Sequence, residues 1–216
     1  YPELREELQK RGHVFSTASD TEVMVHLYED RGADFVRELN GQFALALWDT
    51  RNRQLLLARD RVGIRPLFYT WVGQQLLFAS EIKALFAEPR VQRRLDPRAL
   101  SQVCTLWATC PPRTMFRDVL ELPAGHVMLV KDGRVELKRY WDLRFAGASG
   151  PVTPQQEAAC GEQLFELSKD SIRLRLRADG PVAAYLSGGI DSSFICALVR
   201  TFFHNRLQTF SVSFSD

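Results

Sequence analysis

The most distinctive chemistry in this sequence lies in eight residues at the end of a short apolar stretch. They read Leu186, Ser187, Gly188, Gly189, Ile190, Asp191, Ser192 and Ser193. Two adjacent glycines let the backbone turn tightly and bring its N–H groups close to a ligand. A helix that starts after them adds unpaired N–H groups and the positive end of its dipole. This combination predicts a phosphate-binding loop.

The polar side chains of the loop fit the same chemistry. Serine hydroxyls add hydrogen-bond donors, and the Asp191 carboxylate is expected to hold a Mg²⁺ that neutralises bound phosphate oxygens. The loop contains no lysine and no Gly-x-x-x-x-Gly-Lys pattern, so it is not a Walker loop. The alternative is an ordinary strand-to-helix turn in which Asp or Ser caps the helix. All eight residues in this strand-to-helix context favour the phosphate site.

The elements that position the loop are expected on both sides of it. A strand over residues 181–186 leads into the loop, and an amphipathic helix over residues 190–203 follows. Before them, a helix over residues 155–177 is predicted, with Leu164, Leu167, Ser171 and Leu174 on one face. Glycine, proline and small polar residues at 147–154 predict a linker that separates these elements from the preceding part of the chain.

The part before the linker shows helices followed by hairpins. Ser19 is expected to cap a helix, and Glu22 to reach back to the Ser19 N–H in a capping box. Alternating apolar residues with turn residues between them predict paired strands. The predicted helices are residues 2–11, a helix that starts after Ser19, and 81–87; the predicted strand pairs are 42–49 with 54–58, 66–71 with 76–80, and one pair around 131–134.

Composition excludes several classes of protein. The chain has 216 residues, a formal net charge of +2, 45% apolar residues and 25% charged residues, as ordinary soluble globular proteins do. No apolar run approaches the 18 or more residues of a membrane span, and spread-out charge argues against nucleic acid. The four cysteines are irregularly spaced and no secretory signal is visible, so we expect a cytoplasmic protein with reduced thiols.

The loop resembles the Ser-Gly-Gly-x-Asp-Ser pyrophosphate loop of the N-type ATP pyrophosphatases. That loop alone also allows synthetases of GMP, NAD and argininosuccinate and tRNA-thiolating enzymes. Several earlier blocks, however, are similar in order to a class II glutamine amidotransferase domain, and two later blocks match the end of that domain in glutamine-dependent asparagine synthetases. The earlier blocks are residues 19–23, 39–44, 58–69 and 78–85, and the later ones are 122–126 and 140–143.

This resemblance implies a fold and an activity. The implied fold is α+β followed by α/β: a partial Ntn-type αββα amidotransferase sandwich over residues 1–146, a linker over 147–154, and the start of a Rossmann-like ATP pyrophosphatase domain over 155–216. The implied enzyme is a carbon–nitrogen ligase that uses ATP and Mg²⁺ to activate aspartate as β-aspartyl-AMP, releases pyrophosphate, and amidates the intermediate with ammonia from glutamine. A homodimer without nucleic-acid or membrane partners is expected.

The resemblance also implies roles for single residues. Asp20 matches the aspartate that binds the α-ammonium group of glutamine, and Leu186 and Val212 match positions that contact ATP beside the loop residues Ser187, Gly188, Gly189, Asp191 and Ser192. Arg59 and Asp60 are interpreted as a structural ion pair with hydrogen bonds inside the domain. The histidines form no recognisable ligand or nucleophile pattern and are interpreted as structural or exposed: His13, His26, His126 and His204.

Some family features are not in these 216 residues. The family's nucleophilic N-terminal cysteine, its glutamine-binding arginine and its Asn-Gly oxyanion hole are expected before Tyr1, and a second Ser-Gly block, the aspartate site and a lysine after Asp216. We therefore expect that this chain alone neither hydrolyses glutamine nor makes asparagine. Two alternatives stay open: an amide or β-lactam synthetase relative without glutaminase activity, and a non-catalytic ATP-binding or scaffold protein.

Overall fold

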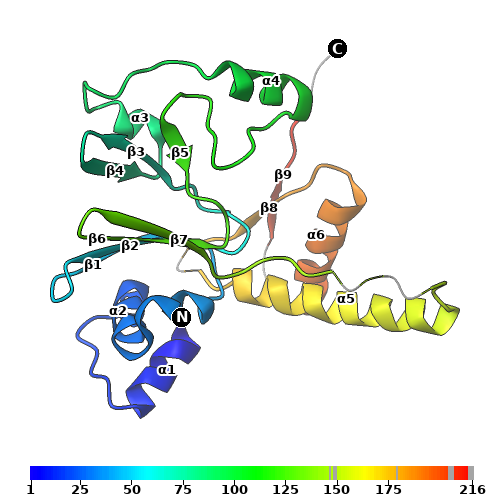
Figure 1. The fold of residues 1–216 in the computed structure, drawn as a ribbon. Helices are drawn as coiled ribbons and strands as arrows, with labels where there is room; N and C mark the ends of the chain where they lie inside the picture. Colours follow the sequence, from blue (N-terminus) through cyan, green and yellow to red (C-terminus); the bar gives the residue numbers. More distant parts are fainter. Residues whose placement is uncertain (146, 148–149, 179, 204–206, 214–216) are drawn as a thin grey trace. The chain divides into compact units, whose positions relative to one another are not determined.

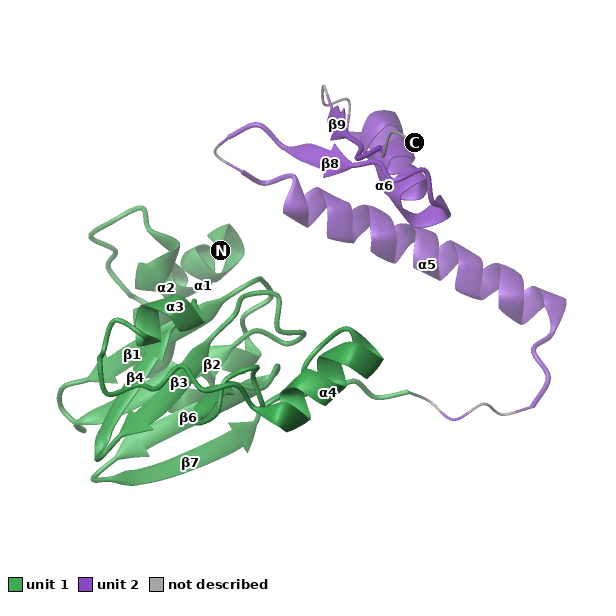
Figure 2. Ribbon diagram, turned by 90° about the horizontal axis from the view of Figure 1, so that it is seen from above, with its two compact units in different colours: residues 1–145 green, residues 146–216 purple. Residues whose placement is uncertain are grey.

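The structure, a computed structural model, describes residues 1–145, 147, 150–178, 180–203 and 207–213. The chain divides into two compact units, residues 1–145 and 146–216, shown in Figure 2, and each is described by itself. Within the predicted linker, positions 148 and 149 lie outside the described residues, and so does His204.

The first unit begins with two helices, α1 (Pro2–Lys10) and α2 (Asp20–Arg31). Ser19 caps α2 as predicted, because its hydroxyl accepts the Thr21 N–H at 3.2 Å. The expected bond from Ser19 N–H to Glu22 is wrong, since the Thr17 hydroxyl already accepts this N–H at 3.1 Å. The Glu22 carboxylate instead accepts the N–H groups of Ser16 and Thr17 at 2.6 and 2.7 Å, which ties the preceding loop to the helix.

Two antiparallel sheets follow, and all three predicted strand pairs are present. The four-stranded sheet has the order β1-β2-β6-β7, and the three-stranded sheet the order β4-β3-β5. The strands of the first sheet are β1 (Ala44–Asp49), β2 (Gln54–Arg59), β6 (His126–Lys131) and β7 (Arg134–Arg139). Those of the second are β3 (Phe68–Val72), β4 (Gln75–Ala79) and β5 (Val119–Glu121).

Alternation along β2 places two different cores on its two faces. Leu56 packs with buried side chains from α1, α2 and the 3₁₀ helix η1 (Gly32–Arg37), whereas its neighbour Leu57 packs with Tyr69 of β3 and Met128 of β6. The four-stranded sheet therefore lies between a helical layer and the second sheet (Figure 1). This packing of apolar side chains on both faces fixes the register of β2, because a shift by one residue would exchange the faces.

The sequence analysis did not predict all of the elements that lie between β4 and β5 along the chain. Helix α3 (Ile82–Leu85) is the shorter form of the helix expected over 81–87. Helix α4 (Pro97–Leu106) was not predicted, although it has a capping aspartate, Asp96, which accepts the Arg98 N–H at 2.9 Å, and a proline in its first turn. Strand β5 is so short that its pairing with β3, and not its own pattern, identifies it.

The second unit contains α5 (Pro154–Arg175), β8 (Ala183–Tyr185), α6 (Ile190–Phe202) and β9 (Gln208–Phe210). The expected order of helix, strand and helix is confirmed, but the expected face of α5 is not the packed one. Leu164 and Leu167 are 64% and 70% exposed, while Phe165, Ile172 and Leu176 join the core formed with α6. None of the described helices combines the length and the apolar character that crossing a membrane requires.

Candidate nucleotide and glutamine sites

The predicted phosphate loop lies at the carboxyl ends of two neighbouring parallel strands. Tyr185 of β8 pairs with Phe210 of β9, and the N–H of Leu186 donates to the Phe210 carbonyl at 2.9 Å. The Ser211 hydroxyl then donates to the Leu186 carbonyl at 2.5 Å. These two bonds fix Leu186 beside the segment that leads to Val212, so the two predicted ATP contacts follow adjacent strands. The carboxyl edge of a parallel sheet is the usual place for ligands in α/β folds.

The backbone of the loop turns at Gly188 and opens into α6. Gly188 has φ +83°, a conformation that glycine adopts without steric cost, and a Cβ placed there would meet no atom within 4 Å. Gly189 is the N-cap residue, and no side chain caps the helix. The first N–H groups of α6 therefore have no intrahelical partner and point out of the helix end, where they can bind an anion.

Two serines hold the loop in this shape. The Ser192 hydroxyl accepts the Ser187 N–H at 3.3 Å, lies 3.0 Å from the Ser187 hydroxyl, and donates to the Gly189 carbonyl at 3.1 Å. The sequence analysis assigned these hydroxyls to the ligand. The structure shows that they also bond to one another across the turn, so they organise the loop before any ligand binds.

Asp191 is the acidic residue in the first turn of α6, and its side chain is exposed. A carboxylate beside open N–H groups is a fitting oxygen ligand for Mg²⁺, which prefers oxygen and retains several waters when it accompanies phosphates. Val212 is 79% exposed at its strand end. The segments after β8 and β9 together offer an apolar side chain, a carboxylate and open N–H groups, which are the group types that a nucleoside triphosphate with its metal requires.

Asp20, the predicted glutamine ligand, lies in the first unit at the start of α2. Its carboxylate is exposed, and its hydrogen-bond partners in the described part of the chain are the hydroxyls of Ser19 and Thr21, at 3.5 and 3.4 Å, so its oxygens keep the capacity to accept stronger bonds. In the same turn, hydrogen bonds from the Thr17 hydroxyl and the Ser16 N–H lower the pKa of Glu22 to about 2. Asp20 and Glu22 therefore place two acidic side chains in the first turn of α2, of which Glu22 is bonded to the preceding loop.

The structural interpretation of Arg59 is confirmed, with a different ion partner from the one expected. Its guanidinium group pairs with Glu121 at 2.5 Å and not with Asp60, and the two side chains are 8% and 15% exposed. The same group donates to three carbonyls, of Leu122, Arg65 and Gly63, each at 2.8 Å. Arg59 thereby links the end of β2 to β5 of the other sheet, a pairing of residues far apart in sequence.

Asp60 is buried and has a purely structural environment. Its carboxylate accepts four backbone N–H groups, from Phe43, Val62, Ile64 and Arg65, at 2.9 to 3.3 Å. The carbonyl of Asp60 accepts the N–H of Gly125 at 2.9 Å. Because these bonds use the acceptor positions of the carboxylate, no substrate role is available to Asp60 in this conformation.

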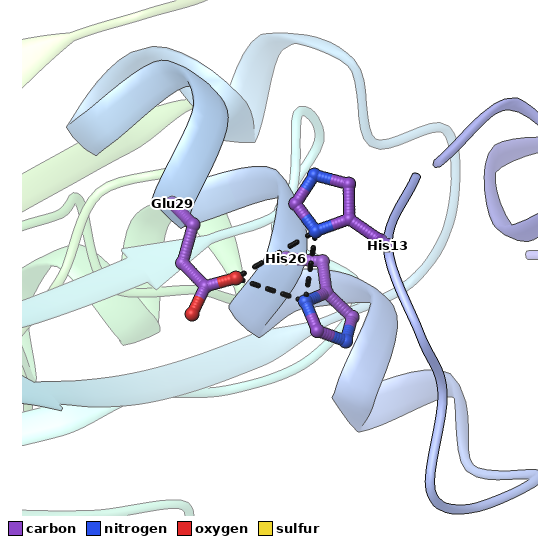
Figure 3. A group of neighbouring side chains, drawn as sticks. All are labelled: His13, His26 and Glu29. Carbon is purple, nitrogen blue, oxygen red and sulfur yellow. Dashed lines mark hydrogen bonds and ion pairs between the residues drawn. The ribbon is translucent and has the colours of Figure 1, made fainter. Parts of the chain in front are cut away.

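One histidine agrees with the interpretation of the sequence, and two others differ from it. His126 is structural, with its Nδ1 2.7 Å from the Ala124 carbonyl. His13 and His26, however, approach each other to 3.1 Å between their Nδ1 atoms and share a neighbour, Glu29, so they do form a ligand pattern (Figure 3). Sequence reasoning missed this group because His13 lies outside the helix that carries the other two residues. The His26-x-x-Glu29 spacing was the signal available.

Known proteins match both units of the chain. The glutamine amidotransferase domain family matches residues 1–141, and the asparagine synthase family matches residues 163–216. Asparagine synthetase (glutamine-hydrolyzing) 3 of Bacillus subtilis is 36% identical over 99% of this chain, and asparagine synthetase (glutamine-hydrolyzing) 1 of the same organism is 36% identical over 100%. Amidase chyE of Penicillium rubens is 38% identical over 86%.

The chain spans about a third of the length of these curated relatives, namely 35%, 33% and 27%. Among solved structures, the glutamine phosphoribosylpyrophosphate amidotransferase of B. subtilis aligns with 97% of this chain and 42% of its own, with 18% identity and a TM-score of 0.46.

Proposed function

We propose, from the premise that this chain belongs to the glutamine amidotransferase domain family, that the protein acts as a glutamine-dependent asparagine synthetase. The match of residues 163–216 to the asparagine synthase family and the names of the two Bacillus relatives support this reading. The observation that carries it is the strand–loop–helix of residues 183–202, with open N–H groups at the loop and Asp191 beside them.

In this proposal the loop binds the pyrophosphate part of ATP. The first N–H groups of α6 would donate to phosphate oxygens, and Leu186 and Val212 would contact the nucleoside. The hydroxyls of Ser187 and Ser192 would donate to the phosphate by exchanging their present bonds to Ser192 and to the Gly189 carbonyl. The Asp191 carboxylate would hold Mg²⁺, which supplies positive charge against the developing charge of pyrophosphate. Backbone donors fixed in advance stabilise that charge without reorganisation during the reaction.

The chemistry proceeds in two steps. A carboxylate oxygen of aspartate attacks the α-phosphorus of ATP, the bond to the β-phosphate oxygen breaks, and pyrophosphate leaves with that electron pair. Ammonia then attacks the activated carbonyl carbon, the bond to AMP breaks, and a proton is lost as the amide forms. Activation is necessary because a free carboxylate has no adequate leaving group.

Asp20 is proposed to bind the α-ammonium group of glutamine. The support is its exposed carboxylate with only two long contacts to hydroxyls, in a helix turn that also carries the ionised Glu22. Binding the ammonium group would distinguish the amino acid glutamine from a simple amide. A carboxylate–ammonium contact would also place the side-chain amide in a fixed orientation.

We further propose the finer fold assignments. The helical layer and the two stacked antiparallel sheets of residues 1–145 support an Ntn-type αββα sandwich of which this chain holds a part. The parallel pair of β8 and β9 with the following and preceding helices supports a Rossmann-like domain over 155–216. A segment at 147–154 would join them, in a cytoplasmic enzyme.

Two variants in the intact protein test the two proposed sites separately. Asp191→Asn should abolish asparagine formation from aspartate, ATP and either nitrogen source, and leave glutamine hydrolysis intact. Asp20→Asn should abolish asparagine formation with glutamine but preserve it with added ammonium chloride. Asparagine and glutamate are measured by amino-acid analysis, and pyrophosphate by a coupled assay.

A matched control in the same unit is Glu6→Gln for Asp20→Asn, since Glu6 is an exposed carboxylate on α1 outside the proposed glutamine site. Equal loss of the glutamine and ammonia reactions in Asp20→Asn would contradict its assignment. Pyrophosphate release that persists in Asp191→Asn would contradict the assignment of the loop.

A second function is favoured by the 38% identity to a relative named an amidase. In that case the protein would form or break an amide on another carboxylic acid. The acceptor decides between the two: ATP-dependent pyrophosphate release that requires aspartate supports the asparagine synthetase, and release that is indifferent to aspartate supports the second function.

A further inference from the structure

We propose that His13, His26 and Glu29 form a binding site for a divalent transition metal ion of the Zn²⁺ class. The three side chains converge in the first unit, with His13 in the loop after α1 and the other two on α2 (Figure 3). The proposal concerns these residues alone and does not depend on the function proposed above.

The separations of the three donor atoms match the coordination sphere of zinc. The two Nδ1 atoms are 3.1 Å apart, Glu29 Oε2 lies 2.9 Å from His26 Nδ1, and it lies 3.7 Å from His13 Nδ1. Ligand atoms about 2.0–2.1 Å from a tetrahedral metal are about 3.3 Å from one another. A point about 1.9 Å from all three atoms lies in their plane, so a metal slightly above this plane reaches each at a normal bond length.

The backbone holds these donors before any metal binds. The N–H groups of Gly12 and His13 donate to the carbonyls of Gln9 and Leu8 at 3.0 and 3.1 Å, which is the Schellman arrangement that ends α1. Gly12 has the positive φ, +100°, that this arrangement requires. His26 and Glu29 stand three residues apart on α2, and therefore on one face. His13 is therefore held by the capped end of α1, and His26 and Glu29 are held by α2.

The hydrogen bonds of His13 also fit a bound metal, whereas His26 Nε2 is buried with no hydrogen-bond partner among the described residues. A His ligand that uses Nδ1 carries its proton on Nε2, and His13 Nε2 lies 2.9 Å from Asp30 Oδ1, as in the carboxylate–histidine–metal arrangement. Asp30 is itself paired with Arg11 at 3.3 Å. Without a metal, a single proton on His26 Nδ1 can be donated either to His13 Nδ1 or to Glu29, but not to both. A cation satisfies all three atoms at once.

Ligand type and exposure identify the class of ion. Two imidazoles with one carboxylate favour zinc and its neighbours over Mg²⁺ or Ca²⁺, which prefer oxygen. The two histidine side chains are each 16% exposed and Glu29 is 56% exposed, so the site is open on one side. A water or an external ligand would complete four coordination. The ion would fasten the loop of residues 11–18 to α2.

Titration of the 216-residue chain with Zn²⁺ against a chromophoric chelator tests the site. The four cysteines, none of them paired and three of them exposed, are first alkylated so that thiolates cannot bind the metal. We expect one Zn²⁺ per chain with micromolar or tighter affinity, and Co²⁺ should give the visible absorption of a four-coordinate nitrogen–oxygen site. Glu29→Gln and His26→Gln should each weaken binding at least tenfold, and Asp30→Asn roughly 10- to 100-fold.

His126→Gln is the matched control, since this histidine bonds to Ala124 outside the cluster and should leave the affinity unchanged. Because Glu29 is exposed, its variant keeps the test valid even where His26→Gln impairs folding. The proposal is overturned if the alkylated chain, at micromolar concentration, binds no Zn²⁺ when the ion is present in about 50-fold excess. It is equally overturned if Glu29→Gln and the folded histidine variants bind Zn²⁺ with the affinity of the parent, because the two histidines would then only share a proton.

Discussion

Strand β2 ends at Arg59, with Asp60 and then Gly63 in the turn that follows, and strand β8 ends at Tyr185, with Ser187 and then Gly188 after it. Both turns combine polar side chains with a glycine of positive φ, +72° and +83°. In the first turn, the Arg59 guanidinium donates to backbone carbonyls and the Asp60 carboxylate accepts backbone N–H groups. In the second, the helix N–H groups remain open and the side chains of Ser187 and Asp191 are exposed.

The difference separates a structural polar group from one that we propose binds a ligand. Asp60 has four N–H donors within the fold and is 1% exposed, whereas Asp191 is exposed on a helix end that no side chain caps. A buried carboxylate must have its bonds supplied by the protein, because an unpaired one is costly. A ligand site needs the opposite, which is donors and acceptors whose partners are supplied from solution.

Removal of the Asp60 carboxylate should give the largest effect on stability. Asp60→Ala leaves the N–H groups of Phe43, Val62, Ile64 and Arg65 without their acceptor, and the free energy of unfolding should fall by about 3–5 kcal/mol. Urea denaturation followed by tryptophan fluorescence reports this unit, since all four tryptophans lie within residues 1–145.

Asp191→Ala is the matched substitution at the other strand end. It should change the free energy of unfolding by no more than about 0.5 kcal/mol, because the residue is exposed. Thermal unfolding followed by circular dichroism measures this change. A large loss of stability in Asp191→Ala, or none in Asp60→Ala, would break the comparison.

Glycine substitutions should separate the surroundings of Asp60 from the turn at Gly188 further. A Cβ at Gly125, which donates to Asp60, would lie 2.5 Å from the Trp141 carbonyl oxygen in addition to the strain of φ +66°, so Gly125→Ala should cost roughly 3 kcal/mol. Gly188→Ala meets no atom within 4 Å and should cost roughly 1 kcal/mol from φ alone.

The same Gly188→Ala variant should lower Mg-ATP affinity at least tenfold, measured by calorimetry, since its Cβ would occupy the space of the ligand. Gly133→Ala is the control for strain, with φ +72° and no atom within 4 Å at a hairpin turn. It should match Gly188→Ala in stability and leave Mg-ATP affinity unchanged. Equal stability losses at Gly125 and Gly133 would show that the contact with Trp141 has no effect.

The serine pair of the nucleotide loop should show coupling. Ser187→Ala or Ser192→Ala alone removes the bond between their hydroxyls, and each should weaken Mg-ATP binding about tenfold, or about 1.4 kcal/mol. The double variant should lose less than the sum of the single losses, because the pair acts as one unit. Strictly additive losses would mean that the serines contact the ligand independently and do not organise the loop.

The smallest effect concerns acid stability at the end of β1. Hydrogen bonds from Asn52, then from the Tyr28 hydroxyl and the Arg51 N–H, lower the pKa of Asp49 from 3.8 to about 2. Its contribution to stability is therefore complete above pH 3.8 and disappears as the pH falls through 2. The urea midpoint of the parent should exceed that of Asp49→Asn at pH 6, and the gap should close near pH 2. A gap that stays constant between these pH values would contradict this assignment.

Local signals predicted much of the fold. Alternation of apolar residues, turn residues and a helix cap identified the hairpins, α2 and the strand–loop–helix of residues 183–202, since each of these depends on neighbours within a few residues. Helix α4 was missed although Asp96 and Pro97 mark its start. The face of α5 was misassigned because helical periodicity allows two overlapping apolar stripes, and only the packing of α6 against Phe165 and Ile172 selects one.

The sequence by itself determined the backbone of the predicted phosphate loop, because glycines that turn and a helix start that leaves N–H groups open are properties of consecutive residues. Only the tertiary structure decided which charges meet. Glu121, 62 positions from Arg59, proved to be its ion partner, and His13 joined His26 and Glu29 from a separate segment. Hydrogen bonds and ion pairs depend on distances of a few ångströms in space, and spacing along the chain does not give these until the layers have packed.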